Sequence, residues 1–174
     1  YNIARMFSSL DHISKGRAGW NIVTSFSIAG ANNFGSKGRL SHADRYERAE
    51  EFVEVAKNLW DSWTDDAIVD DRDAGIYYRR DKVRPIDHHG DYYDVAGPMN
   101  VPRSPQGWPL LVQAGSSDTG KDFAARHAEA VFTAHLTKST AQDFYKDLKS
   151  RVVAAGRRAG HVDSIGRAAQ AKPA

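Results

Sequence analysis

The 174-residue sequence contains no cysteine. This absence excludes disulfide bonds, thiolate chemistry and cysteine-ligated metal, and it is typical of a reducing compartment, so we expect a cytoplasmic protein. No apolar run approaches the ~18 residues that a membrane-spanning helix requires, and no signal peptide is recognisable. We therefore expect no association with a membrane.

An excess of charge of one sign is also missing. Lys and Arg total 24 and Asp and Glu total 22, so the net charge is +2 and the pI of about 8.8 reflects near-cancellation. Without a basic patch, nucleic acid is not an expected partner. A hydrophobic content of 41% and a charged content of 26% are typical of a globular domain. Because the chain begins at Tyr1 and not at methionine, we expect a fragment or a processed product.

Short uncharged segments alternate with amphipathic ones, which predicts an α/β fold with a parallel sheet. Apolar residues at helical spacing predict helices over 1–14, 41–63, 118–128 and 141–155. Strands are predicted over 18–26, 110–114 and 130–134, the first of them buried on both faces. A short hairpin is predicted over 83–95, a loop over 27–40, an irregular charged segment over 64–82 and an extended connection over 97–109. No buried strand is predicted in 156–174.

The first candidate site combines the strand near residue 21 with the helix that begins near residue 41. Ser41 is a candidate N-cap, and His42 and Tyr46 share one face of the first helical turns, near free backbone N–H groups. Together with Asn21 they offer polar groups beside a positive helix end, which suits a phosphate or a polar ring edge. In the alternative interpretation, His42 is an ordinary cap-region residue and Tyr46 is the first residue of an apolar stripe.

The second candidate site is the segment 115–120, GSSDTG, between a predicted strand and a predicted helix. Small residues allow a ligand to approach the backbone, and the hydroxyls of Ser116 and Ser117 can bind phosphate oxygens. The segment is not a Walker loop and lacks the spacing of a dinucleotide fingerprint. In the alternative interpretation it is a tight turn in which Asp118 caps the helix.

Two other kinds of site are not expected. The adjacent His88 and His89 would point to opposite faces of a strand, so we predict no metal site there. The sequence also has no G-x-S-x-G, which excludes the nucleophile elbow of a serine hydrolase.

Several stretches, in order, resemble one family: LDHISKGRAGWNIVTS, ANNFG, SHADRY with AEEFVEVAKNLWDSW, and IDHHGDYYDVAGPMNVPRSPQGWPLLVQAGSSDTGKDFAARHAEAVFT. It is the flavin-dependent monooxygenase family that includes the large component of nitrilotriacetate monooxygenase and the dibenzothiophene-sulfone and long-chain-alkane monooxygenases, within the bacterial luciferase-like superfamily. The resemblance covers about residues 1–157. It implies a (β/α)8 TIM barrel, of which this chain holds about three central strands, their helices and a short hairpin insertion.

The resemblance also implies an activity and its site. Reduced FMN, supplied by a separate NAD(P)H:flavin reductase, activates O₂, and one oxygen atom enters a small organic substrate. Asn21, His42 and Tyr46 would contact the flavin, and Ser116 and Ser117 would bind its phosphate. His42 is the best candidate for a catalytic hydrogen-bond donor, although no general acid or base is identified. A full-length enzyme of this family is expected to form a homo-oligomer.

The extent of the resemblance sets limits on this expectation. Residues 1–157 are predicted to form the central part of the barrel, and 158–174 a weakly ordered tail without family-like sequence. We expect such a fragment to be inactive and to bind FMN weakly or not at all, so micromolar affinity in a flavin titration would contradict this. Two alternatives are a luciferase-like oxidoreductase that uses a deazaflavin, and a truncated, non-catalytic remnant of the barrel.

Overall fold

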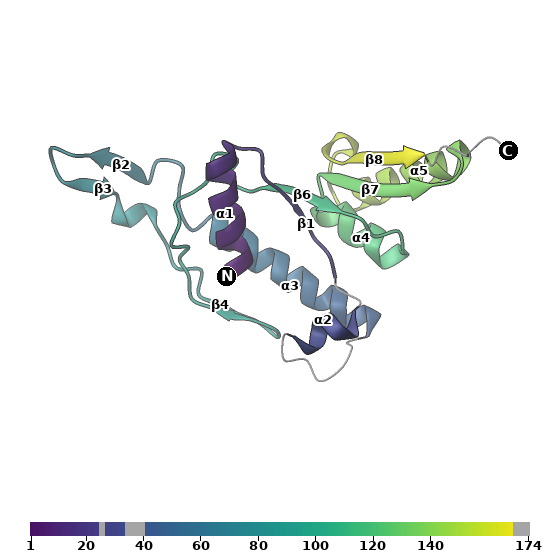
Figure 1. Ribbon diagram of the computed structural model, residues 1–174, viewed down its shortest axis with the longest axis horizontal. Helices are drawn as coiled ribbons and strands as arrows, with labels where there is room; N and C mark the ends of the chain where they lie inside the picture. The colour runs from purple at the N-terminus through teal and green to yellow at the C-terminus, as the bar shows by residue number, and fades with distance from the viewer. Residues whose placement is uncertain (25–26, 34–40, 169–174) are drawn as a thin grey trace. The chain divides into compact units, whose positions relative to one another are not determined.

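The computed structural model describes residues 1–24, 27–33 and 41–168 (Figure 1). The chain divides into two compact units. The first unit comprises Tyr1–Trp20 and Arg48–Pro109, and the second comprises Asn21–Glu47 and Leu110–Ala174. The boundary therefore passes through strand β1 (Gly19–Asn21) and helix α3 (His42–Trp60). In the part of the chain that the structure describes, no helix is long and apolar enough to cross a membrane.

The first unit contains the helix predicted at the start of the chain, α1 (Asn2–Ser14). It ends as predicted, because Lys15 adopts the left-handed conformation with φ 56° and Gly16 follows at φ 78°. The predicted stripe of α3 is confirmed at Val53, Ala56 and Trp60, which are buried. An aromatic cluster surrounds the buried Trp20, whose ring lies 5.8 to 6.0 Å from the rings of Phe7, Phe52 and Trp60.

Two hairpins belong to the first unit. The one predicted over 83–95 is confirmed, since β4 (His88–His89) pairs antiparallel with β5 (Asp94–Val95). The other corrects a prediction: in the segment expected to be irregular, β2 (Ile68–Asp71) pairs with β3 (Ile76–Tyr78), and the 3-10 helix η1 (Arg80–Lys82) follows. All residues of both strands are exposed, so the burial-based alternation that identifies a half-buried strand is absent.

The second unit is built on a sheet with the strand order β1-β6-β7-β8. Strands β6 (Leu110–Gln113), β7 (Ala130–His135) and β8 (Asp163–Ala168) are parallel neighbours, which confirms the predicted α/β class. Helices α4 (Asp118–His127) and α5 (Lys138–Ala154) connect these strands (Figure 1). A buried cluster joins both helices to the sheet: Ala124, Ala125, Ala128, Val131, Phe144, Leu148, Val152 and Val162.

The opposite face of this sheet is partly exposed in the described residues. Side chains alternate along β6 and β7, so Leu111 and Val131 are buried whereas Leu110 and Phe132, which point to the other face, are exposed. A strand sequence that is apolar on both sides is typical of parallel sheets covered on both faces.

Three predictions around the first strand and the tail are corrected. The strand predicted over 18–26 is limited to Gly19–Asn21, and only Trp20 within it is buried. The loop predicted over 27–40 contains the short helix α2 (Ile28–Asn32), while 25–26 and 34–40 lie outside the described residues.

The third correction concerns 156–174, where no buried strand is predicted. The 3-10 helix η2 (Ala159–His161) is followed by β8, which pairs with β7 along its whole length, from Ala130↔Asp163 to His135↔Ala168. The backbone groups of β8 find their hydrogen-bond partners in β7, and the composition of the segment does not reveal this pairing. Residues 169–174 lie outside the described residues, and the boundary at 157 stays a prediction.

Candidate functional site

The predicted phosphate-binding segment forms the turn between β6 and α4. Ser117, not Asp118, is the N-cap of α4, because the Ser117 hydroxyl oxygen accepts a hydrogen bond from the backbone N–H of Gly120 at 3.1 Å. The side chains of Ser116 and Ser117 are exposed. The turn therefore presents two hydroxyls at the positive end of a helix, as the second candidate site requires.

Both glycines of this turn are needed for a close approach by Tyr46. A Cβ atom on Gly120 would lie 2.8 Å from the Tyr46 hydroxyl oxygen, and one on Gly115 would lie 3.1 Å from the same oxygen. These distances are shorter than ordinary van der Waals contact. The hydroxyl of Tyr46 thus occupies the space that side chains at Gly115 and Gly120 would fill.

Tyr46 lies near the start of helix α3 and reaches the loop between β6 and α4. Helix α3 begins where the sequence predicts it. The Ser41 hydroxyl oxygen accepts from the backbone N–H of Asp44 at 3.1 Å, in the position of a helix cap. Tyr46 is buried, and its ring packs 5.6 Å from the ring of Phe123 in α4. It is therefore a core residue that also contacts the turn between β6 and α4. His42 is exposed, one helical turn earlier, with its ring 5.0 Å from that of Tyr46.

The structure therefore brings together four of the five predicted cofactor residues: His42, Tyr46, Ser116 and Ser117. The fifth, Asn21, is exposed at the end of β1, beside Ile22, whose backbone N–H donates to the Val112 carbonyl at 2.8 Å. Among residues 1–24, 27–33 and 41–168, no hydrogen bond or ring contact joins Asn21 to the other four. Its place in the site stays a prediction.

Gln113 lies just before the segment 115–120 and is not among the predicted cofactor-binding residues. It is the last residue of β6 and is buried, and its side-chain carbonyl oxygen accepts a hydrogen bond from the backbone N–H of Gly115. A Cβ on Gly115 would also lie 2.6 Å from the Gln113 side-chain nitrogen. The available signal was a polar side chain at the end of an otherwise apolar strand, immediately before a glycine turn.

The charged side chains beside the turn are already paired. Asp118 accepts from Lys121 at 3.0 Å and from Arg151 at 2.8 Å, and both cations also bind Asp147. The hydrogen bond from Lys121 is the main reason that the pKa of Asp118 lies below its ordinary value, and the bond to Asp147 raises the pKa of Lys121. The carboxylate of Asp118 is thus neutralised, which lowers its repulsion of an anion at the turn.

The adjacent histidines of the β4–β5 hairpin bind different carboxylates. The His88 ring lies 3.0 Å from a Glu51 oxygen, and the His89 ring lies 2.8 Å from an Asp94 oxygen. In the described part of the chain, no group of three or more His, Cys, Asp or Glu side chains is arranged to hold a metal ion.

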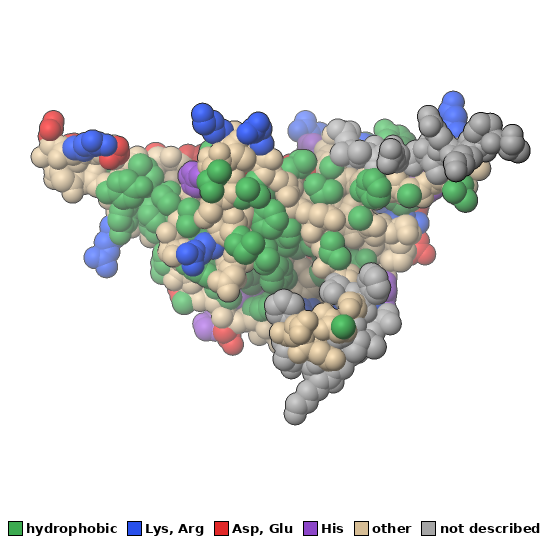
Figure 2. All heavy atoms as spheres, in the orientation of Figure 1, with side chains coloured by type: hydrophobic (Ala, Val, Ile, Leu, Met, Phe, Trp, Pro, Cys, Tyr) green, Lys and Arg blue, Asp and Glu red, His purple; other side chains and the backbone are tan. Residues whose placement is uncertain are grey.

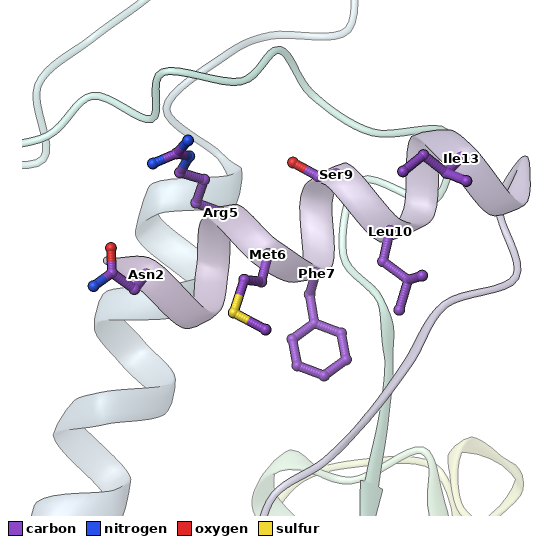
Figure 3. Close-up of a pocket in the computed structure, with 7 residues that line it drawn as sticks. All are labelled: Asn2, Arg5, Met6, Phe7, Ser9, Leu10 and Ile13. Atoms are coloured by element: carbon purple, nitrogen blue, oxygen red, sulfur yellow. The ribbon is translucent and has the colours of Figure 1, made fainter.

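A surface hollow lies along α1, in the first unit. Its lining comes from α1 alone, and Met6, Phe7 and Leu10 extend from the same side of the helix (Figure 3). Met6, Leu10 and Ile13 are exposed apolar residues, and the hollow offers only Arg5 as a charged group. It therefore lacks the convergent polar groups of a ligand site.

Known proteins resemble this chain over almost its whole length. Residues 1–171 match the luciferase-like monooxygenase family. Nitrilotriacetate monooxygenase component A of Aminobacter aminovorans is 54% identical over 157 residues, which are 90% of this chain and 35% of that protein. The chain thus spans about a third of the length of the curated relatives it matches.

Two solved structures have the same fold in the matching region. A long-chain alkane monooxygenase superposes with a TM-score of 0.92 at 41% identity, over 95% of this chain and 38% of that one. A riboflavin lyase, solved with modified FMN and riboflavin, gives a TM-score of 0.90 at 38% identity, over 95% and 37%. The α/β arrangement described above therefore corresponds to part of a luciferase-like barrel.

Proposed function

The chain belongs to the luciferase-like monooxygenase family, and from this we propose that it forms part of an FMN-dependent monooxygenase. Reduced FMN, when bound, supplies the electrons that activate O₂, and one oxygen atom is transferred to a small organic substrate. A separate NAD(P)H:flavin reductase delivers the reduced cofactor. The relatives' names support a monooxygenase, and the lyase structure with modified FMN supports a flavin as the ligand.

One observation carries the assignment of the cofactor: the turn between β6 and α4 suits the phosphate of FMN. Ser116 and Ser117 offer exposed hydroxyls, and both lie at the N-terminal, positive end of α4. Tyr46 places a hydroxyl against Gly115 and Gly120. We assign Ser116, Ser117 and Tyr46 to the phosphate end of FMN.

The remaining predicted residues would act on the ring system of the flavin. His42 is exposed next to Tyr46, and its imidazole can donate a hydrogen bond to a polar edge of the ring. Asn21, at the end of β1, can offer its amide to the same ligand. His42 is therefore our candidate for the donor near the reacting part of the cofactor, and Asn21 for a second contact.

The proposal is tested by comparing FMN with riboflavin, which lacks the phosphate. In the 174-residue chain, FMN should shift the backbone amide NMR signals of Gly115, Ser117 and Gly120, whereas riboflavin at the same concentration should leave them unchanged. Ser117→Ala should weaken the FMN response at least about tenfold, since hydrogen bonds to charged groups contribute roughly 1.5–3 kcal/mol. We expect saturation only at millimolar FMN.

Thr137→Ala is the matched control. Thr137 is the N-cap of α5 and accepts from the backbone N–H of Thr140, so its loss removes a comparable helix cap away from the turn. Both variants should lose about 1 kcal/mol of stability, but Thr137→Ala should keep the FMN response. Equal responses to FMN and riboflavin, or equal FMN affinity of both variants, would contradict the assignment.

A further inference from the structure

Strand β6 is apolar except for its last residue, Gln113. Only 3% of Gln113 is exposed, and the turn that we assign to the FMN phosphate follows it directly. Burying an amide costs free energy unless its polar atoms find hydrogen-bond partners. An amide buried at this position therefore needs a partner close to the turn.

The partner of the Gln113 side chain is the first glycine of the turn. The side-chain carbonyl oxygen accepts a hydrogen bond from the backbone N–H of Gly115, two residues on, which is the pattern of an Asx turn made with a longer side chain. The amide also lies against the Gly115 backbone, since a Cβ there would be 2.6 Å from the side-chain nitrogen. Gln113 therefore holds the peptide group that precedes the Gly115 Cα atom in one orientation.

The backbone N–H groups of the turn are occupied at its two ends. Gln113 takes that of Gly115, and the Ser117 hydroxyl oxygen takes that of Gly120 at 3.1 Å. In the described part of the chain, no hydrogen bond engages the N–H groups of residues 116–119. These four donors lie between two fixed ends, so their arrangement depends on the bonds at both ends.

The turn offers a phosphate neutral donors. The cations beside it, Lys121 and Arg151, are both paired with aspartates. On the face that Figure 2 shows, Lys and Arg side chains are dispersed over several elements and are not gathered in one place. Hydrogen bonds from neutral donors weaken steeply with poor distance or angle. The residues that fix the turn should therefore influence how well it binds a phosphate.

We propose that Gln113 is a positioning residue of this site. By holding the N–H of Gly115, it fixes the start of the turn so that the groups of Ser116 and Ser117 can bind a phosphate. Its burial keeps its own amide away from the ligand. A neutral amide suits this position, because a carboxylate there would repel the phosphate. The proposal rests on the assignment of the turn to FMN.

Substitutions at 113 separate the hydrogen bond from the bulk of the side chain. Gln113→Met keeps an unbranched side chain and removes the acceptor, whereas Gln113→Asn keeps an acceptor that can reach the N–H two residues on. In the 174-residue chain, Gln113→Met should accelerate hydrogen exchange at the Gly115 amide and raise the Kd for FMN about three- to tenfold. Gln113→Asn should keep the Gly115 amide protected and bind FMN within about twofold of the natural chain. The amide NMR signals of Ser117 and Gly120 report the Kd.

A third variant gives an intermediate case. In Gln113→Thr a hydroxyl replaces the amide, and hydroxyls make the same kind of bond more weakly. Both Gly115 exchange and the Kd for FMN should then lie between those of Gln113→Asn and Gln113→Met. This variant decides the proposal if circular dichroism shows Gln113→Met to be unfolded.

Thr133→Val is the matched control. Thr133 is a buried polar residue of the neighbouring strand β7, and its hydroxyl oxygen lies 2.8 Å from a ring nitrogen of His135, two residues on. The substitution removes a similar local bond from the same sheet, away from the turn. It should leave Gly115 exchange and the Kd for FMN unchanged, even where it lowers the urea midpoint of unfolding.

The proposal requires the affinity for FMN to follow the protection of Gly115 across these proteins. A variant at 113 that exposes the Gly115 amide and still binds FMN as tightly as the natural chain overturns it, while the assignment of the turn to FMN stands. A loss of affinity in Thr133→Val equal to that in Gln113→Met also overturns it, because the role of Gln113 would then be general stability. If the natural chain responds equally to FMN and riboflavin, the assignment of the turn fails and this proposal fails with it.

Discussion

The two units of this protein are stabilised by different kinds of contact. In the first unit, buried polar groups bind backbone atoms of distant segments: the Trp60 indole N–H donates to the Ala4 carbonyl at 2.9 Å, and that of Trp63 donates to the Met99 carbonyl at 2.8 Å. In the second unit, the buried cluster between α4, α5 and the sheet is aliphatic and aromatic. The buried polar residues of this unit bond to near neighbours in sequence: Gln113 to the backbone N–H of Gly115, and Thr133 to the ring of His135.

This difference follows from the amount of regular structure in each unit. The connection 97–109 in the first unit contains no helix or strand, so its backbone groups need side-chain partners when they are buried. In the second unit, parallel strands and helices satisfy most of the backbone, so the core needs fewer polar side chains. Side chains that bind backbone atoms therefore replace secondary structure where the chain is irregular.

The largest effect is expected from a cavity in the second unit. Leu148 of α5 is fully buried in the apolar cluster, so Leu148→Ala should lower the free energy of unfolding by about 2–5 kcal/mol. Val153→Ala shortens an exposed side chain of the same helix and should change the free energy of unfolding by less than about 0.5 kcal/mol. Urea denaturation measures both. Equal effects would show that this cluster does not stabilise the unit.

A smaller effect is expected from the polar contacts of the first unit. Asp11 is fully buried in α1, and its carboxylate accepts hydrogen bonds from the backbone N–H groups of Ala18 and Gln106 and from the Gln106 side chain. Asp11→Ala leaves the two backbone N–H groups without a partner and should cost about 1–3 kcal/mol at pH 6. Asp91→Asn, at an exposed aspartate, is the control.

The stabilisation that Asp11 provides should also depend on pH. Burial alone would raise the pKa of Asp11, but the hydrogen bonds from Gln106, Ser104 and Ala18 outweigh it and hold the pKa below its ordinary value. The stabilisation by this carboxylate is then complete above a pH of about 4 and is lost as the pH falls through the folded-state pKa. The difference in urea midpoint between the natural protein and Asp11→Ala should therefore shrink between pH 6 and pH 2. A constant difference would show that the ionised form is not what stabilises the unit.

The smallest effect is expected from the ion pairs of the second unit. Arg151 binds Asp118, Asp122 and Asp147 at 2.6 to 2.9 Å and so connects α5 to the first turns of α4. These groups are partly exposed, so Arg151→Ala should cost less than about 1 kcal/mol, and less still in high salt. Lys146→Ala, at an exposed position on the same helix, is the control. A loss of several kcal/mol would mean that the second unit also depends on polar contacts.

Much of the candidate site followed from local patterns. Ser41 caps α3 as predicted, and the strand, turn and helix around 115–120 form where the sequence predicts them. Hydrogen bonds within a few residues determine such features, so a short window of sequence contains their cause. The two hairpin strands and β8 were missed because exposed strands and edge strands lack the apolar alternation that marks a strand.

The sequence by itself determined the α/β class, the starts of α3 and α4 and the polar character of the turn after β6. Only the tertiary structure decided that Tyr46 approaches Gly115 and Gly120. Tyr46 lies on a different element from both glycines, and its approach depends on how the start of α3 packs beside α4. That packing depends on the ring contact with Phe123 and on the absence of two Cβ atoms. Contacts between residues so far apart along the chain have no signature in local spacing, because the folded core alone brings them together.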